Sequence, residues 1–115
     1  MLGREQEKFS RHVLLLLINI DADGYTFRLG ETYRSPADQI ARFHSGASQS
    51  PSSLHFYKLA IDLFIFKDGK YLKEKKDLQE IGDYWESLDE INKWGGNWNN
   101  FLDTDHFQRT VPGLL

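Results

Sequence analysis

The amino-acid sequence predicts a small fold of mixed helices and strands, and three local patterns carry this prediction. Apolar residues recur at helical spacing over residues 4–20, they alternate along residues 59–66, and a Ser-Pro pair at 35–36 marks a helix start. A chain of 115 residues suffices for one hydrophobic core of ordinary size. We therefore expect a single domain over residues 1–115.

The first helix is predicted over residues 4–20, because its apolar side chains fall on one face and its charged side chains on the remaining surface. The segment Asp21–Gly24 ends this helix, and the alternating residues 25–29 then predict a strand that leads towards Tyr33 and Arg34. The apolar helix positions are Phe9, Val13, Leu16, Leu17 and Ile20.

A second, short helix is predicted from Pro36 to about His44. Ser35 is a favoured N-cap residue, and proline is favoured at the first helical position. Gly46 closes this helix. Residues 45–53 are rich in serine and turn-forming residues and have little to bury, so they predict a surface loop.

Residues 59–66 predict a central strand, because they are apolar on both faces and are followed by a turn sequence at residues 67–70. Asp62 is the anomaly in this strand. A carboxylate in such a position is costly to bury unless it is paired or binds a metal.

The C-terminal part of the chain is predicted to contain one helix and one or two short strands. Residues 70–80 carry many charges and indicate a solvated surface segment with no function. A helix is predicted over residues 82–93, ended by Gly95-Gly96, and strands over residues 97–108. The three tryptophans, Trp85, Trp94 and Trp98, are expected in the core rather than as a platform for saccharides.

Charge and composition exclude several classes of function. The net charge is −3, so no basic field attracts nucleic acid, and no nucleic-acid partner is expected. Cysteine is absent, so any metal must be held by histidines and carboxylates. The longest apolar run covers residues 13–18, too short for a membrane span or a signal peptide.

Two histidines stand in company that suggests a metal site. His55 lies seven residues before Asp62, and His106 lies near the C-terminus. Two imidazoles and one carboxylate form the usual ligand set of a catalytic zinc site, which leaves a fourth position for water. From spacing alone an ordinary hydrogen-bonded His–Asp pair is favoured over a metal site, because this is what a histidine near an aspartate usually forms. His12 and His44 are expected in surface or capping roles.

Four segments then resemble one known family. The segment Ser53–Asp62 resembles the S-x-H-x-x-G-x-A-x-D motif of the D-alanyl-D-alanine carboxypeptidase and dipeptidase family of zinc peptidases, which also contains phage L-alanyl-D-glutamate endolysins. The segment Asp103–His106 resembles the second motif of this family, an acidic residue three positions before the last zinc ligand. The segment Glu31–Gln39 is similar to the E-x-Y-R-[ST] segment, and Trp94–Trp98 is similar to the W-G-G-x-W turn of phage-type members.

The resemblance implies a zinc site and a general base. Asp103 is the implied base, which takes a proton from the water that zinc activates. Lys58 stands where the wider family has glycine, and Gln108 stands where glutamate is frequent, but neither departure removes an implied ligand. The implied zinc ligands are His55, Asp62 and His106.

The resemblance also implies how the substrate is held. Arg34 would face the oxyanion that develops on the scissile carbonyl, and Ser53 and Gln39 would contact the substrate peptide. Simpler roles stay open for all three: an ion pair for Arg34, an ordinary loop position for Ser53 and a helix surface for Gln39. The implied fold is α+β, with a small central antiparallel sheet, helices packed on one side and the zinc in a cleft on the other face.

The implied function is that of a phage-type endolysin, a zinc-dependent L-alanyl-D-glutamate endopeptidase that hydrolyses an amide bond of the peptidoglycan stem peptide. A D-alanyl-D-alanine carboxypeptidase or dipeptidase would use the same zinc site. A non-catalytic metal-binding or protein-binding module on the same fold is the alternative of another class, and the presence of Asp103 and Arg34 argues against it. We expect a monomer that is made in the host cytoplasm without a signal peptide and acts at the cell wall or periplasm.

Overall fold

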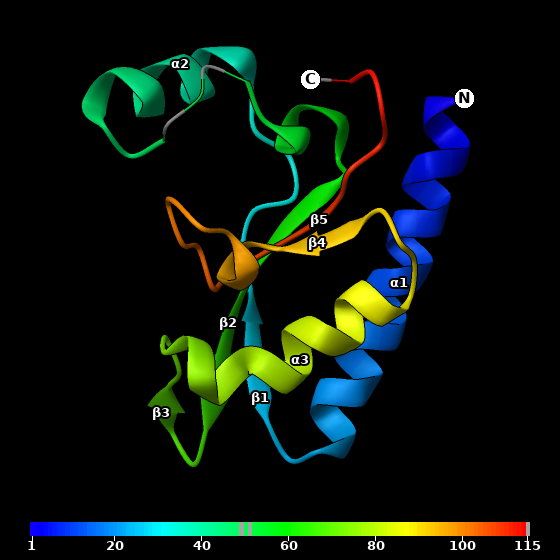
Figure 1. Cartoon of the computed structure of the whole chain (residues 1–115), viewed down its shortest axis with the longest axis vertical. Coiled ribbons are helices and arrows are strands. Elements are labelled where there is room, and N and C mark those ends of the chain that lie inside the picture. Colours follow the sequence, from blue (N-terminus) through cyan, green and yellow to red (C-terminus); the bar gives the residue numbers. More distant parts are fainter. Residues whose placement is uncertain (49, 51, 115) are drawn as a thin grey trace.

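The computed structural model describes all residues except 49, 51 and 115, and within them it has three α-helices and five strands (Figure 1). Two positions of the predicted serine-rich loop therefore lie outside the described residues. None of the helices in the described part of the chain is both long and apolar enough to cross a membrane. The elements are α1 (Leu2–Ala22), β1 (Thr26–Leu29), α2 (Pro36–Ser45), η1 (Leu54–Tyr57), β2 (Ala60–Lys67), β3 (Lys70–Tyr71), α3 (Lys75–Ser87), β4 (Asn92–Trp94), η2 (Gly95–Asn97) and β5 (His106–Arg109).

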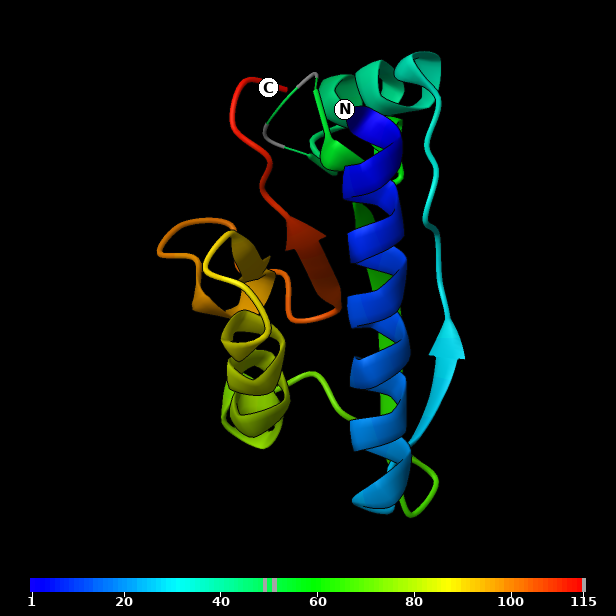
Figure 2. The same ribbon diagram turned by 90° about the vertical axis from the view of Figure 1, so that its right-hand side faces the viewer.

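The strands form an antiparallel sheet in the order β1-β2-β5-β4, and β3 pairs with the far end of β2. Figure 2 shows α1 lying along one face of this sheet with β2 behind it, while α2 lies at one end of the molecule. Because successive strand residues point to opposite faces, Ile61, Leu63 and Ile65 enter the core while Asp62 and Phe64 face a cleft on the other side. The α+β prediction, with helices on one face and the cleft on the other, is confirmed.

The core lies between the helices and the sheet, and aromatic rings fill its centre. The Trp85 ring meets Phe9 of α1 and Phe107 of β5 edge-on, with centroids 5.7 Å and 6.0 Å away. Trp85 and Trp94 are fully buried, which confirms the prediction for these two. Trp98 is only half-buried and lines the cleft, so it belongs to the site as much as to the core.

The prediction for the third helix was wrong at both ends. The helix α3 runs from Lys75 to Ser87 rather than over residues 82–93, so it takes up much of the segment that was predicted to be surface. Its buried stripe is Leu78, Ile81 and Trp85, at helical spacing, and the charged residues between them face solvent. Beyond the helix, Asn92 begins β4 and is fully buried.

The first two helices agree with the sequence. In α2 the Ser35 side chain accepts a hydrogen bond from Asp38 N, and Gly46 ends the helix at a φ of 83°. His44 is exposed, as expected. His12 is not on the open surface: its ring meets Trp85 edge-on, and its Nδ1 accepts a hydrogen bond from the Asn92 amide.

Two glycines make room for the Trp94 ring. A Cβ atom on Gly82 would lie 2.1 Å from this ring, and one on Gly96 would lie 2.2 Å from it. The prediction that Gly95-Gly96 ends a helix was wrong, because α3 ends at Ser87 and β4 precedes this pair. Gly96 instead lets the η2 turn pack on Trp94. Gly95 is needed for a different reason, since a Cβ there would lie 2.2 Å from the backbone oxygen of Asp103.

Candidate metal centre

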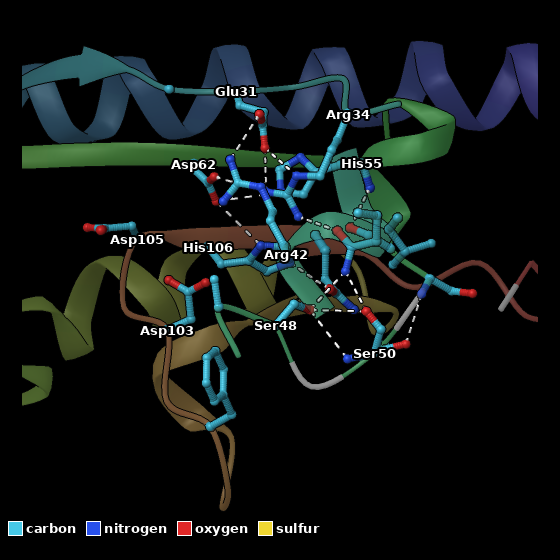
Figure 3. Close-up of a pocket in the computed structure, with 18 of the residues that line it drawn as sticks. Glu31, Arg34, Arg42, Ser48, Ser50, His55, Asp62, Asp103, Asp105 and His106 are labelled. Carbon is cyan, nitrogen blue, oxygen red and sulfur yellow. Dashed lines mark hydrogen bonds and ion pairs between the residues drawn. The ribbon is translucent and has the colours of Figure 1, made fainter. Parts of the chain in front are cut away.

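The structure brings His55, Asp62 and His106 together on the cleft side of the sheet. Asp62 of β2 and His106 of β5 are direct partners in the strand register, and His55 comes from η1 just before β2. Asp62 Oδ1 lies 3.6 Å from His55 Nε2 and 3.5 Å from His106 Nδ1. One donor atom from each residue lies within 4.8 Å of the others. Figure 3 shows the three side chains close together in the cleft.

Local structure fixes each of these side chains. The hydroxyl of Ser53 caps η1 by accepting a hydrogen bond from His55 N. Gly30 packs closely against the backbone of Asp62 in β2. Its N donates to Asp62 O at 2.8 Å, and a Cβ atom on Gly30 would lie 2.7 Å from that oxygen. Lys58 ends η1 at a φ of 55°, in the left-handed region, which explains why glycine suits this position in the motif.

Hydrogen bonds select which nitrogen of each ring is free. His55 Nδ1 lies 3.3 Å from Thr32 O, so this nitrogen carries the proton and Nε2 keeps its lone pair. His106 Nε2 lies 2.7 Å from Gln108 Oε1, which leaves Nδ1 free. Gln108 in turn donates to Thr110 Oγ1. Gln108, which stands where the family often has glutamate, thus still orients His106.

The donor set fits a zinc ion. Among the described residues His55 Nε2 is buried and has no hydrogen-bond partner, and 3.5–3.6 Å is too long for a hydrogen bond to Asp62. Ligand atoms about 2.0–2.1 Å from a tetrahedral zinc ion lie about 3.3 Å apart, close to the two separations found here. A divalent cation would also satisfy the orphaned nitrogen.

The two aspartates near His106 have different surroundings. Thr104 and Asp105 form a turn in which His106 N donates to Asp103 O, and this turn brings Asp103 to the cleft. Figure 3 shows the Asp103 carboxylate beside His106, whereas that of Asp105 points away from the ligands. Asp105 accepts a hydrogen bond of 2.6 Å from the Tyr71 hydroxyl.

Burial and neighbouring charges shift the acidities in opposite directions. Burial opposes ionisation of Asp62, but His106 and His55 outweigh it and hold the pKa of that carboxyl well below its usual range. Burial raises the pKa of Asp103, and the nearby Asp62 adds to this. The cleft therefore pairs an anionic candidate ligand with a carboxylate that has a stronger tendency to accept a proton.

Arg34 lies against Asp62 and is oriented by two neighbours. Its Nε donates to Glu31 Oε1 at 2.5 Å, its Nη1 donates to Gln39 Oε1 at 2.6 Å, and its Nη2 lies 3.9 Å from Asp62 Oδ2. Gln39 is buried rather than on the helix surface, and its Nε2 donates to Ser48 Oγ and Ser50 O. Its amide is thus used within the protein to orient Arg34.

All seven residues singled out in the sequence line one cleft of about 640 Å³. The sequence analysis assigned no role to Glu31, although it stands three residues before Arg34 in the quoted segment. Tyr71 was missed because it lies in a charged segment that has no recognisable pattern. Trp98 also lines the cleft, with its ring centroid 5.1 Å from that of His106.

Comparisons with known proteins identify the family of this chain. Residues 46–109 match the family model described as D-alanyl-D-alanine carboxypeptidase. The L-alanyl-D-glutamate peptidase of a Listeria phage is 30% identical over 95 residues, which are 81% of this chain and 34% of that protein. The chain thus spans about a third of the length of this relative.

Two solved structures of peptidases are similar to this chain. The L-Ala D-Glu endopeptidase ChiX of Serratia marcescens superimposes with a TM-score of 0.62 at 30% identity, covering 73% of this chain and 66% of ChiX. The vancomycin resistance D,D-pentapeptidase VanY, solved in complex with Zn(II), shares the fold at 14% identity, with a TM-score of 0.55 over 90% of this chain and 71% of VanY. The family model covers more than half of the described residues, and so this chain belongs to the D-alanyl-D-alanine carboxypeptidase family of peptidases.

Proposed function

We propose that this chain is a zinc-dependent peptidoglycan peptidase that hydrolyses the L-alanyl-D-glutamate bond of the stem peptide. The observation that carries the proposal is the convergence of two free imidazole nitrogens and one carboxylate in a cleft that also holds Asp103 and Arg34. Support for the substrate comes from the Listeria phage peptidase and from ChiX, whose names specify this bond.

The proposed metal ligands are His55 through Nε2, His106 through Nδ1 and Asp62 through a carboxylate oxygen. A bound zinc ion supplies a Lewis acid and lowers the pKa of its water ligand towards about 7. The protein orients this site through the Thr32 carbonyl and the Gln108 amide, because each accepts the proton of the ring nitrogen that does not bind metal.

Asp103 is the proposed general base. Its raised pKa makes it a better proton acceptor near neutral pH than an ordinary exposed aspartate. As the attacking water forms a bond to the scissile carbonyl carbon, Asp103 takes one of its protons. It then delivers this proton to the nitrogen of the leaving amine, so that the amide bond breaks and the carboxylate is regenerated.

Arg34 is the proposed partner of the carbonyl oxygen. When water attacks, negative charge develops on that oxygen, and a guanidinium already fixed by Glu31 and Gln39 stabilises it without rearrangement. Ser53 is the proposed contact to the peptide backbone, since its oxygen accepts from His55 N and its hydroxyl donates no hydrogen bond to the described residues of the cleft.

We further propose that residues 1–115 act as one monomeric catalytic unit at the cell wall. The core that positions the site draws on both ends of the chain, because Phe9 of α1 and Phe107 of β5 both contact Trp85.

Digestion of purified muropeptides followed by mass spectrometry tests the reaction. Cleavage between L-alanine and D-glutamate is expected, with about one zinc per chain, and removal of zinc by a chelator should abolish it. Loss of only a terminal D-alanine would instead identify a carboxypeptidase. Zinc binding without release of any fragment at any pH would identify a non-catalytic module.

Two matched variants test the assignment of the base. Asp103→Asn keeps the shape and removes the proton acceptor, so zinc should stay bound and kcat should fall about 10²–10⁴-fold. Asp105→Asn should cost far less, because Asp105 is engaged by Tyr71. Rates in the opposite order, in folded and zinc-loaded proteins, would show that the base is misassigned.

A further inference from the structure

The cleft contains a second guanidinium that the proposed reaction does not use. Arg42 extends from α2 into the cleft towards Glu31 (Figure 3). Its side chain is 46% exposed, compared with 10% for Arg34. The charged residues among the described lining are Glu31, Arg34, Arg42, Asp62, Asp103 and Asp105.

Most of these charges already have a partner within the protein. Arg34 and Glu31 form a close ion pair, and Asp105 accepts a hydrogen bond from Tyr71. Asp62 is a metal ligand under the proposed function. Arg42 is different, because its Nη2 lies 3.6 Å from Glu31 Oε2 and an exposed ion pair of this length contributes little. Arg42 lines the cleft, and its side chain donates no hydrogen bond to another described residue.

A series of contacts links Arg42 to the candidate metal site. Asp62 Oδ2 lies 3.9 Å from Arg34, Arg34 contacts Glu31, and Glu31 lies within ion-pair distance of Arg42. The Glu31 carboxylate is thus shared by the two guanidinium groups, and Arg42 lies one carboxylate away from Arg34. Consecutive residues of an extended peptide are about 3.8 Å apart, so a group on the residue next to the scissile bond can reach it.

We propose that Arg42 is a specificity-determining residue that binds a free carboxylate on the substrate residue whose amine is released. This inference rests on the proposed function and names the feature that the cleft selects. A guanidinium presents two parallel N–H donors that match a carboxylate, and an amide in the same place accepts only one such bond and carries no charge. The D-glutamate of an L-alanyl-D-glutamyl bond and the terminal residue of D-alanyl-D-alanine both offer this group.

The test compares each substrate with the same peptide in which this single carboxylate is amidated. For zinc-loaded protein of unchanged sequence we expect kcat/KM to be about 10–100-fold higher for the acid, the range of a hydrogen bond between ionised groups. Arg42→Ala should bring the acid-to-amide ratio close to one, and Arg42→Lys should retain part of it. Running the L-alanyl-D-glutamyl and D-alanyl-D-alanine pairs side by side shows which carboxylate Arg42 binds.

Arg28→Ala is the matched control, because the Arg28 guanidinium lies over the Phe66 ring and does not line the cleft. It should keep the full acid-to-amide ratio. An unchanged ratio in Arg42→Ala would overturn the inference, and so would a ratio of one in the protein of unchanged sequence.

Binding separates this inference from the proposed function. Calorimetry with zinc-loaded Asp103→Asn measures the affinity for the acid and amide peptides without turnover. A preference for the acid that Arg42→Ala abolishes supports the assignment of Arg42 even if no peptide is cleaved. Equal affinity of Asp103→Asn for the acid and amide peptides overturns the inference, even if the protein of unchanged sequence cleaves them efficiently.

Discussion

Among the described residues, Arg34 and Arg109 are the two buried arginines, with 9% and 3% of their surface exposed. Both form ion pairs with acidic side chains, but the surroundings of the two arginines differ. Arg109 Nε donates to Glu5 Oε2 at 2.7 Å, and its Nη1 donates to Asp89 Oδ2 at 2.8 Å. These bonds join β5 to α1 and to the turn that follows α3.

Strand alternation directs Arg109 away from the cleft, whereas Arg34 lies in the segment between β1 and α2. In β5, His106 and Gln108 line the cleft, whereas Phe107 and Arg109 point to the opposite face. Arg109 therefore has carboxylates on both sides and no access to substrate. Arg34 has one charged partner, one neutral partner and an open side towards Asp62 and the cleft. Burial and ion pairing alone do not separate a structural arginine from a catalytic one, but the open side does.

Of the variants that compare the two arginines, Arg34→Ala should have the largest effect. Arg34→Ala should lower kcat about 10²–10³-fold, the usual result of losing an oxyanion donor, and should leave the zinc content unchanged. Its effect on thermal stability should be smaller than that of Arg109→Ala, because Arg34 donates to one carboxylate and one neutral amide whereas Arg109 donates to two carboxylates. Steady-state rates and elemental analysis measure these quantities, and unchanged rates in a folded protein would reduce Arg34 to a structural ion pair.

Arg109→Ala should have the opposite profile. It leaves Glu5 and Asp89 without their shared cation and should destabilise the fold by about 2–3 kcal/mol, somewhat less than breaking a fully buried pair because both carboxylates are partly exposed. Thermal unfolding measures the loss. Zinc-loaded, folded protein should keep kcat within about twofold. A fall in kcat as large as that of Arg34→Ala would contradict the distinction between the two arginines.

The Arg109 cluster should also make stability depend on pH. The hydrogen bond from Arg109 lowers the pKa of both Glu5 and Asp89. For a carboxylate whose pKa is lowered by folding, the stabilisation is present above its unfolded pKa and is lost as pH falls through its folded pKa. The difference in unfolding temperature between the unchanged protein and Arg109→Ala should therefore shrink as pH falls from about 5 to 3, with both proteins free of metal.

A pH-independent difference over this range would show that Arg109 stabilises the fold through packing rather than through its charges. Lys93→Ala serves as the control, because Lys93 is exposed and lies in the neighbouring strand β4. Its unfolding temperature should stay parallel to that of the unchanged protein across the range.

Local patterns predicted the elements whose signals lie within a few residues. Ser35, Pro36 and Gly46 mark both ends of α2, and the apolar run of β2 with Asp62 as its anomaly indicates both a central strand and a site. The position of α3 differs from the prediction because its buried residues stand singly among charges, and because residues 92 and 93 of the predicted helix belong to β4.

The ligand set was predicted by motif, whereas the contacts that orient it were not. Glu31, Gln39 and Arg34 are near in sequence, but their hydrogen bonds depend on how α2 is placed over the cleft. Tyr71 and Asp105 are 34 positions apart, and Glu5 and Arg109 are 104 apart. Such pairs leave no periodic trace in one sequence, because either partner alone has the pattern of an ordinary surface residue.

The smallest effect concerns the backbone that leads away from His55, where neither arginine cluster acts. Lys58 is exposed and adopts a φ of 55° and a ψ of 42°, a conformation that costs a residue with a Cβ atom about 1–2 kcal/mol. Lys58→Gly removes this strain but increases the freedom of the unfolded chain, so a net gain of about 0.5–1 kcal/mol is expected. The unfolding temperature should then rise by about 2–4 °C, without a change in kcat. Lys58→Ala is the control, since it shortens the side chain but keeps the Cβ atom and the strain. Equal gains from the alanine and glycine variants would show that the long lysine side chain, and not the left-handed backbone, is what costs stability beside the metal centre.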